Sequence, residues 1–167
     1  MPRETVLIRR ATVNDSDLVA SLLLRLLSEL YDPRQYGYRA DTLGPAARAL
    51  LQDGRGYWAL LAFAPAGEAV GVVTLNECAA VYAFGNFGEI PELYVVPEHR
   101  STGVGAQLVR AAVEFGRERG WSLLEVGAPG VPRWQRTVDF YARCGFEEVG
   151  PRMTLYLSAH DNVIHDL

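Results

Sequence analysis

"PEHRSTGVGAQLVRAAVEFGRERG", residues 97–120, is the most informative segment of this sequence for the fold. Two glycines, Gly103 and Gly105, lie one residue apart between a strand-like segment and a run with the apolar spacing of a helix. In a tight turn that opens a helix, successive N–H groups point at one spot, and the positive end of the helix favours a phosphate group there. Glycine lets the backbone come close and take a positive φ. The stretch therefore predicts a strand, a turn able to hold a phosphate, and an amphipathic helix packed on a sheet.

The spacing of this turn differs from the two common nucleotide-binding motifs. A dinucleotide fingerprint requires a third glycine, and Leu108 occupies that position. A P-loop requires a lysine, and the chain contains none, because all 16 basic residues are arginine. The same composition excludes every mechanism that forms a Schiff base on lysine. A tight strand-to-helix turn without a ligand remains the alternative for the two glycines taken alone.

Bulk composition narrows the class of protein. A chain of 167 residues predicts a single domain, 1–167. A net charge of -4 and a pI of about 5.4 disfavour a nucleic-acid partner. Neither Cys78 and Cys144 nor the three histidines have metal-ligand spacing, so no metal is expected. The absence of a secretory signal and of a long apolar run predicts a cytoplasmic protein with no membrane partner.

Hydrophobic periodicity and turn signals predict the element order β-α-α-β-β-β-α-β-α-β-β. The expected elements are a strand over 5–11, a helix over 17–31, a helix beginning near 42 with Pro45 in its first turn, an antiparallel hairpin of 57–64 and 69–77, a loose connection over 78–88, a strand over 89–96, a helix over 104–119, a strand over 122–129, a helix over 134–144, and strands over 146–150 and 153–157. This order predicts an α/β (α+β) fold, with a mixed, mostly antiparallel, twisted sheet of about seven strands flanked by about four helices. The tail from about 158 is expected to be weakly ordered.

Two motifs give the glycine turn a family context. "RSTGVGA" (100–106) fits R/Q-x-x-G-x-G/A after a strand ending in "LYVVPE", and "DFYARCGFEEVG" follows at 139–150. Together these segments resemble the GNAT superfamily of N-acetyltransferases, and the resemblance covers most of the chain. It implies an acyltransferase that moves an acetyl group from acetyl-CoA, its co-substrate, to a primary amine of a small molecule or peptide.

The resemblance also implies where acetyl-CoA binds. Backbone N–H groups of the turn would cradle the pyrophosphate, with the Arg100 side chain as a fixed charge at the mouth. A bulge at Pro91 and Glu92 would splay the preceding strand from its neighbour, so that the open backbone pairs with the pantetheine arm. The cofactor-binding candidates are therefore Arg100, Ser101, Thr102, Gly103, Val104, Gly105 and Ala106 of the turn, and Leu93, Tyr94, Val95 and Val96 of the strand.

One position departs from the family pattern. Many relatives carry an asparagine seven residues before the motif tyrosine, where it bonds the pantetheine arm, but this chain has Trp134 there. Either the neighbouring Gln135 takes over that contact, which makes it a further cofactor-binding candidate, or the contact is lost.

Acetyl transfer to an amine requires a base for the amine, a donor for the developing oxyanion and a proton for the departing thiolate. The resemblance assigns the last role to Tyr141, whose phenol is neutral at pH 7. Glu89 and Glu92 are the candidate bases, and Glu89 is the closer match by position, while a solvated glutamate is the alternative for each. Residues three apart face opposite sides of a regular strand, which a bulge between them would change. The oxyanion donor is expected to be an N–H near Tyr94 or Val95.

The acceptor amine is usually held, in this fold, by the first two helices and the loop between them. Carboxylates and tyrosines from these regions suit a cationic amine. The substrate-binding candidates from these regions are Glu29, Tyr31 and Tyr36. Tyr82, from the segment "VYAFGNFG" (81–88), is a further candidate, because this segment could wall the same pocket. Arg34 and Arg39 could equally hold a carboxylate on an amino-acid substrate, and a turn residue or a small core is the alternative for each candidate.

Two other functions remain open at this point. A catalytically silent acyl-CoA-binding regulatory domain would share the phosphate turn, but Tyr141 and the two glutamates favour an enzyme. A generic phosphate-binding domain would require the "FY…GF" segment to be a coincidence. The resemblance also implies that a homodimer could form, since the last strands of relatives often pair between chains.

Overall fold

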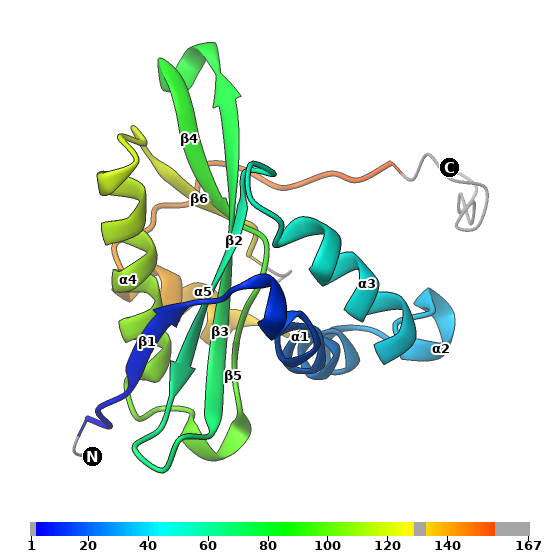
Figure 1. Cartoon of the computed structure of the whole chain (residues 1–167). Helices are drawn as coiled ribbons and strands as arrows, with labels where there is room; N and C mark the ends of the chain where they lie inside the picture. Colours follow the sequence, from blue (N-terminus) through cyan, green and yellow to red (C-terminus); the bar gives the residue numbers. More distant parts are fainter. Residues whose placement is uncertain (1–2, 129–132, 156–167) are drawn as a thin grey trace. The chain divides into compact units, whose positions relative to one another are not determined.

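The computed structural model describes residues 3–128 and 133–155 (Figure 1). The chain forms two compact units, residues 1–128 and residues 129–167. All strands of the described residues belong to the first unit. That both units form one domain stays a prediction from the length of the chain.

The first unit combines one sheet with four α-helices among the described residues. Its strands are β1 (Leu7–Arg10), β2 (Tyr57–Phe63), β3 (Ala69–Ala80), β4 (Gly85–Ile90), β5 (Leu93–Val95) and β6 (Leu124–Val126), and its α-helices are α1 (Ser16–Leu30), α2 (Pro33–Tyr36), α3 (Ala40–Leu50) and α4 (Val104–Glu118). The strand order is β1-β2-β3-β4-β6, and β5 pairs with β3. Of the strand pairs in the described part of the chain, only β4–β6 is parallel. The structure confirms the predicted mixed, mostly antiparallel sheet with flanking helices, with six strands among the described residues.

Helices cover both faces of this sheet, α1 and α3 on one side and α4 on the other (Figure 1). Gly71 of β3 faces α4, because a Cβ at this position would lie 2.9 Å from Leu108. Tyr94 of β5 faces α1, since its hydroxyl donates to Glu29 at 3.4 Å. The core between the layers includes the fully buried side chains of Val19, Leu61, Leu75 and Val104.

An extra residue interrupts the pairing along β3. Asn76 pairs with Glu89 of β4, whereas Val73 pairs with Leu93 of β5. On β3, two residues lie between Val73 and Asn76. Between their partners, Leu93 of β5 and Glu89 of β4, lie the three residues 90–92. This count defines a β-bulge of one residue, which bends the strand and increases its twist.

The bulge lies where proline was expected to interrupt the ladder. The Thr74 N–H donates to the Glu92 carbonyl at 2.9 Å, so these two residues stand opposite each other. Ile90 and Pro91 are left opposite the single residue Leu75. Proline suits this place because it has no N–H to offer to the ladder. The structure thus confirms the interruption predicted at Pro91.

Two local predictions in the first unit are wrong. Pro45 lies in the interior of α3, because the helix begins at Ala40, where the Thr42 hydroxyl accepts the Arg39 N–H at 3.1 Å. Residues 78–88 are not a loose connection. β3 continues to Ala80 and pairs in register with β4 from Gly85, so the two strands form a second hairpin through a short 3-10 turn.

The second unit contains α5 (Gln135–Arg143), which ends where Gly145 takes a φ of +97°, as predicted. The strand predicted over 146–150 is wrong, because these residues have no strand structure. A strand requires a paired neighbour, and no described strand pairs with this segment. In the strand predicted over 153–157, residues 153–155 have no strand structure, and the rest lies outside the described residues, as does the tail from 158.

Gly88 of β4 is a position where a side chain does not fit. A Cβ there would lie 2.3 Å from two ring carbons of Trp121 and 2.9 Å from Leu124. We predict that Gly88→Ala lowers the free energy of unfolding by about 1–3 kcal/mol, because an added methyl group in a packed core forces its neighbours to move. Urea unfolding of Gly88→Ala, Trp121→Leu and the double variant measures this. The double variant should lose less than the sum of the two single losses; strictly additive losses would contradict the account.

Candidate functional site

The turn before α4 presents a row of backbone donors. Ser101 and Gly103 have φ values of +63° and +92°, and left-handed residues of this kind orient neighbouring N–H groups toward one concavity. The Gln107 N–H donates to the Gly103 carbonyl at 3.1 Å and begins the helical ladder. Within the described residues, no acceptor is recorded for the N–H groups from Ser101 to Ala106. Such donors at a helix N-terminus fit a phosphate group.

The Arg100 side chain is bonded to α1 and β5. Its Nη2 donates to both carboxylate oxygens of Glu29, at 2.7 and 2.9 Å, and its Nε donates to the Val95 carbonyl at 2.8 Å. The guanidinium also lies over the Tyr94 ring, 5.4 Å from its centroid. The Arg100 N–H donates to the Pro97 carbonyl at 3.2 Å. Arg100 therefore ties the turn to α1, and Glu29 balances the charge that the sequence placed at the mouth of the turn.

β5 has one paired edge and one open edge. The Val96 N–H donates to a carbonyl of β3 at 3.0 Å, and the Glu92 carbonyl accepts an N–H of β3 at 2.9 Å. Because backbone groups alternate in direction along an antiparallel strand, those of Leu93 and Val95 point away from β3. On that side β6 pairs with β4 but, within the described residues, not with β5. An extended ligand can add to such an edge as a further strand.

Glu92 is partly buried and bonded to two hydroxyl groups. The Thr74 hydroxyl donates to Oε2 of Glu92, and the Tyr57 hydroxyl donates to the same oxygen at 3.1 Å. Burial raises the pKa of Glu92, and the charge of Glu89 adds to this increase, while the two hydrogen bonds oppose it. Burial and the charge of Glu92 raise the pKa of Tyr57 as well, so its hydroxyl remains a donor. A carboxyl group with a raised pKa is typical of general acids and bases.

The bulge brings Glu89 to the same face of the sheet as Glu92. Glu89 is the register partner of Asn76, and Glu92 stands opposite Thr74. Asn76 and Thr74 are two apart on one strand, so their side chains share a face. Without the extra residue, the two glutamates would lie on opposite faces. The structure therefore places both candidate bases on the face covered by α1.

A third carboxylate extends this acidic face onto β6. Glu125 is in register with Glu89 across the parallel β4–β6 pair. The hydroxyl of Tyr82, a predicted acceptor-binding residue, donates to Glu125 at 2.7 Å. This contact fixes Tyr82 against the edge of the sheet and adds a negative charge that suits a cationic ligand.

The other predicted acceptor-binding residues lie around the end of α1. Tyr31 and Tyr36 pack with Tyr38, and the three ring centroids are 5.2–6.1 Å apart. Glu29 is bonded to Arg100, as described above. Tyr31 and Tyr36 thus belong to one aromatic cluster, whereas Glu29 forms an ion pair with Arg100.

Tyr141 and Gln135 belong to α5 in the second unit. The Tyr141 ring packs edge-on against Phe146, with the ring centroids 5.6 Å apart. Burial raises the pKa of Tyr141 to about 12, so the phenol keeps its proton at neutral pH. The Gln135 side chain donates to Asp139 at 2.8 Å. The roles of both residues stay predictions from the motif.

Sequence reasoning missed Tyr57, Thr74 and Glu125, which touch the predicted site residues. They lie on β2, β3 and β6, and only the register of the sheet brings them to Glu92 and Tyr82. One signal was present for Thr74. A hydroxyl inside the apolar run "VGVVTL" is fully buried and must find a hydrogen-bond partner.

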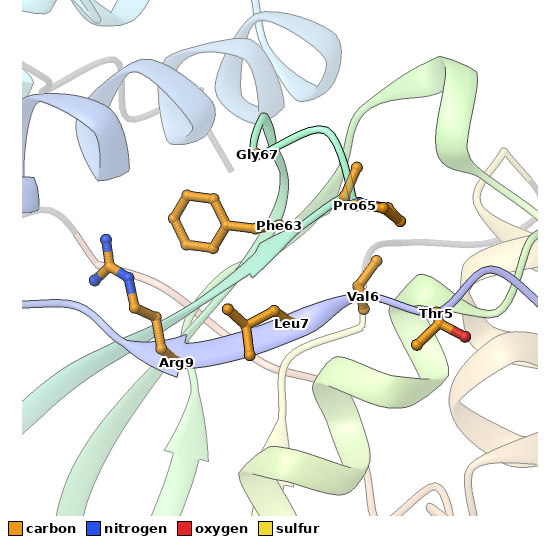
Figure 2. Close-up of a pocket in the computed structure, with 8 residues that line it drawn as sticks. Thr5, Val6, Leu7, Arg9, Phe63, Pro65 and Gly67 are labelled. Carbon is orange, nitrogen blue, oxygen red and sulfur yellow. The ribbon is translucent and has the colours of Figure 1, made fainter.

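An open hollow of about 600 Å³ lies along β1 and the end of β2. Figure 2 shows side chains that line it. Leu7 and Arg9 line it from β1, and Phe63 and Pro65 line it from the other side. The Arg9 guanidinium lies over the Phe63 ring, 4.8 Å from its centroid. None of the predicted site residues lines this hollow, so we do not place the candidate site there.

Residues 3–128 and 133–155 show neither a metal-binding cluster nor a helix that could cross a membrane. These residues contain no group of three or more His, Cys, Asp or Glu side chains able to hold a metal ion. None of the helices found there combines the length and the apolar character that a membrane span requires.

Known proteins resemble this chain in sequence. The model of the acetyltransferase (GNAT) family matches residues 19–146. An aminoalkylphosphonate N-acetyltransferase of Salmonella typhimurium LT2 is 30% identical over 151 residues, 88% of each chain. An aminoglycoside N(6′)-acetyltransferase type 1 of Klebsiella aerogenes is 42% identical over 67 residues, which are 36% of this chain and 41% of that protein.

Solved structures agree with the sequence matches. A ribosomal-protein-alanine N-acetyltransferase from Brucella melitensis biovar Abortus 2308 has a TM-score of 0.72 and 25% identity, over 92% of this chain and 100% of its own. An aminoglycoside acetyltransferase from an uncultured soil metagenomic sample has a TM-score of 0.76 at 24% identity, over 92% and 99% of the two chains, and shares the fold. The chain therefore belongs to the GNAT family of acetyltransferases, enzymes that use acetyl-CoA as co-substrate.

Proposed function

We propose that this protein is an N-acetyltransferase that moves the acetyl group of acetyl-CoA to a primary amine of a small molecule or peptide. The observation that carries this proposal is the continuity of two features. The open edge of β5 leads, through a short 3-10 turn, into the N–H donors of residues 101–106. One extended ligand with a phosphate group at its end can use both.

Acetyl-CoA fits this arrangement residue by residue. Its pyrophosphate would accept from the N–H groups of Ser101 to Ala106, and its pantetheine arm would pair with Leu93 and Val95. The Val95 carbonyl is already bonded to Arg100, which leaves the Val95 N–H and both groups of Leu93 for the arm. Since the pyrophosphate would bind beyond the end of β5, the thioester would come to the beginning of this strand, at the bulge. Gln135 stays a candidate contact from the motif alone.

Glu92 is the base that we favour for the amine, because it lies at the bulge with a raised pKa. The amine nitrogen attacks the thioester carbonyl carbon, an amide bond forms, and the carbon–sulfur bond breaks. Glu92 takes the proton that the nitrogen loses, a backbone N–H of this strand can donate to the developing oxyanion, and Tyr141 gives a proton to the thiolate. Glu89 is the alternative base, since it is the closer match to the motif by position.

The acceptor that this face favours is a cationic amine. Glu89, Glu92 and Glu125 share one face, and Tyr82 is bonded to the last of them. Carboxylates lower the energy of a nearby ammonium group and raise that of a phosphonate. An aminoglycoside with several amino groups therefore suits the face better than an aminoalkylphosphonate, the substrate class in the name of the Salmonella relative. Glu29, Tyr31 and Tyr36 stay predicted contacts of the acceptor.

Thermal unfolding with acetyl-CoA tests the cofactor, with adenosine and phosphate as controls. A ligand at roughly 100 times its Kd should add about 2.7 kcal/mol to the free energy of unfolding. Thiol release from acetyl-CoA is then followed with kanamycin and with 2-aminoethylphosphonate, and we expect the aminoglycoside to react faster. Binding without transfer to any amine in a broad panel would indicate a silent acyl-CoA-binding domain. No stabilisation by millimolar acetyl-CoA would overturn the proposal.

Replacement of the two glutamates distinguishes the candidate bases. Glu92→Gln should lower kcat about 10²–10⁴-fold, the usual contribution of a general base, and Glu89→Gln should lower it less. Glu118→Gln, at the far end of α4, is the matched control and should react like the wild type. The opposite ranking of Glu92→Gln and Glu89→Gln would assign the base to Glu89.

The pH dependence of the wild type provides a second test of Glu92. A base works only when deprotonated, so kcat/KM should fall as the pH drops through the pKa of Glu92. Because burial raises that pKa, the acid limb should lie above the value of about 4.3 for an exposed glutamate. The limb should disappear in Glu92→Gln. A limb that persists in this variant would belong to another group.

The assignment of Tyr141 is tested by removal of its hydroxyl. Tyr141→Phe should lower kcat with little change in the Kd of CoA, since the phenol acts on the departing thiolate. Phe140→Leu, a neighbour on α5 without a hydroxyl, is the control for packing. Unchanged turnover by Tyr141→Phe would remove the tyrosine from the mechanism.

A further inference from the structure

The N-terminal segment before β1 is fixed across the beginning of α4. The Glu4 N–H donates to the Thr102 carbonyl at 3.1 Å, and the Gln107 side chain donates to the Glu4 carbonyl at 2.7 Å. The Glu4 carboxylate lies 2.7 and 2.8 Å from Nδ1 of His99. We call residues 101–106, with their N–H donors, the donor turn. Three residues in or near this turn, His99, Thr102 and Gln107, thus hold Glu4 in place.

Arg3, the residue before Glu4, therefore lies next to the donor turn. A Cβ placed on Gly103 would lie 3.6 Å from Cγ of Arg3, which is ordinary van der Waals contact. The guanidinium lies at the end of a flexible stem beyond this Cγ, so it can reach a group bound on the N–H donors. Arg3 is exposed, and no ion pair is recorded for it within the described residues.

Arg100, the arginine of the motif, has a different environment from that of Arg3. The Arg100 guanidinium is bonded to both oxygens of Glu29, so much of its charge is balanced inside the protein. A pyrophosphate carries negative charge, and N–H dipoles alone provide only partial positive charges. A second cation at the turn would complete the site, and a guanidinium matches the geometry of phosphate oxygens.

We propose that Arg3 binds the phosphate groups of coenzyme A at the beginning of α4, and that Glu4 positions it there. This inference rests on the proposed function, because it assumes that the turn holds the pyrophosphate. Arg3 lies outside both motifs and reaches the site only through the fold of the N-terminal segment. The co-substrate site would therefore include a residue of the N-terminal segment, which is distant from the turn in sequence.

Calorimetric titration with coenzyme A tests the role of Arg3. Arg3→Gln should raise the Kd about tenfold, which corresponds to about 1.4 kcal/mol, and Arg3→Lys should recover part of the loss. Added salt should weaken binding to the wild type more than to Arg3→Gln, because salt screens the lost charge. Arg10→Gln is the matched control: Arg10 lies on β1 beside Asp53 and should bind coenzyme A like the wild type.

The variant Glu4→Gln tests whether Glu4 positions Arg3 at the donor turn. Loss of the His99 contact should loosen the segment and raise the Kd of coenzyme A by less than Arg3→Gln does. The double variant Arg3→Gln/Glu4→Gln should be no worse than Arg3→Gln alone, because Glu4 acts through Arg3. Fully additive losses would show that Glu4 acts independently, and would overturn its positioning role.

The outcomes separate this inference from the proposed function. Wild-type protein that binds coenzyme A while Arg3→Gln binds it equally well would overturn the role of Arg3 and leave the N-acetyltransferase proposal intact. Wild-type protein that does not bind coenzyme A would overturn both. Unfolding of Arg3→Gln without ligand should match that of the wild type, so that a change in Kd reports on binding.

Discussion

One extra residue opposite Leu75 determines the geometry of the candidate site. It turns the strand between β4 and β5, so that β6 follows β4 but not β5. The same residue brings Glu89 and Glu92 to one face of the sheet. The open strand edge, the position of the carboxylates and the approach to the donor turn are thus consequences of a single irregularity in the register.

The surrounding contacts fix this irregularity in place. Thr74 and Tyr57 satisfy the carboxylate of Glu92, which would otherwise be costly to bury. Arg100 connects the turn to Glu29 on α1, and both side chains of this ion pair are partly exposed, at 43% and 37%. Exposed pairs of this kind contribute about 0–1 kcal/mol to stability. The main effect of this pair is therefore to position the turn relative to α1. The turn itself contains a left-handed Ser101, with a φ of +63°, a backbone conformation that is frequent at ligand-binding sites.

Local sequence signals predicted much of this site. They did not predict the contacts between segments that are distant in sequence. The glycine turn, α4 and the interruption at Pro91 depend on neighbours in sequence, and the structure has all three. The partners of Glu92 and the place of Arg3 depend on sheet register and on the path of the N-terminal segment. The interior position of Pro45 and the hairpin over 78–88 were missed because tertiary packing overrode proline and glycine signals. The strand predicted over 146–150 has no paired neighbour among the described strands.

Amide hydrogen exchange with and without coenzyme A can show whether one ligand binds both along the open edge of β5 and on the donor turn. We expect slower exchange at the N–H groups of Leu93 and Val95 and of Ser101 to Ala106 when coenzyme A is bound. The β1–β2 edge, with its hollow in Figure 2, should exchange at the same rate in both states. Bound coenzyme A that leaves exchange across 93–106 unchanged would contradict the account.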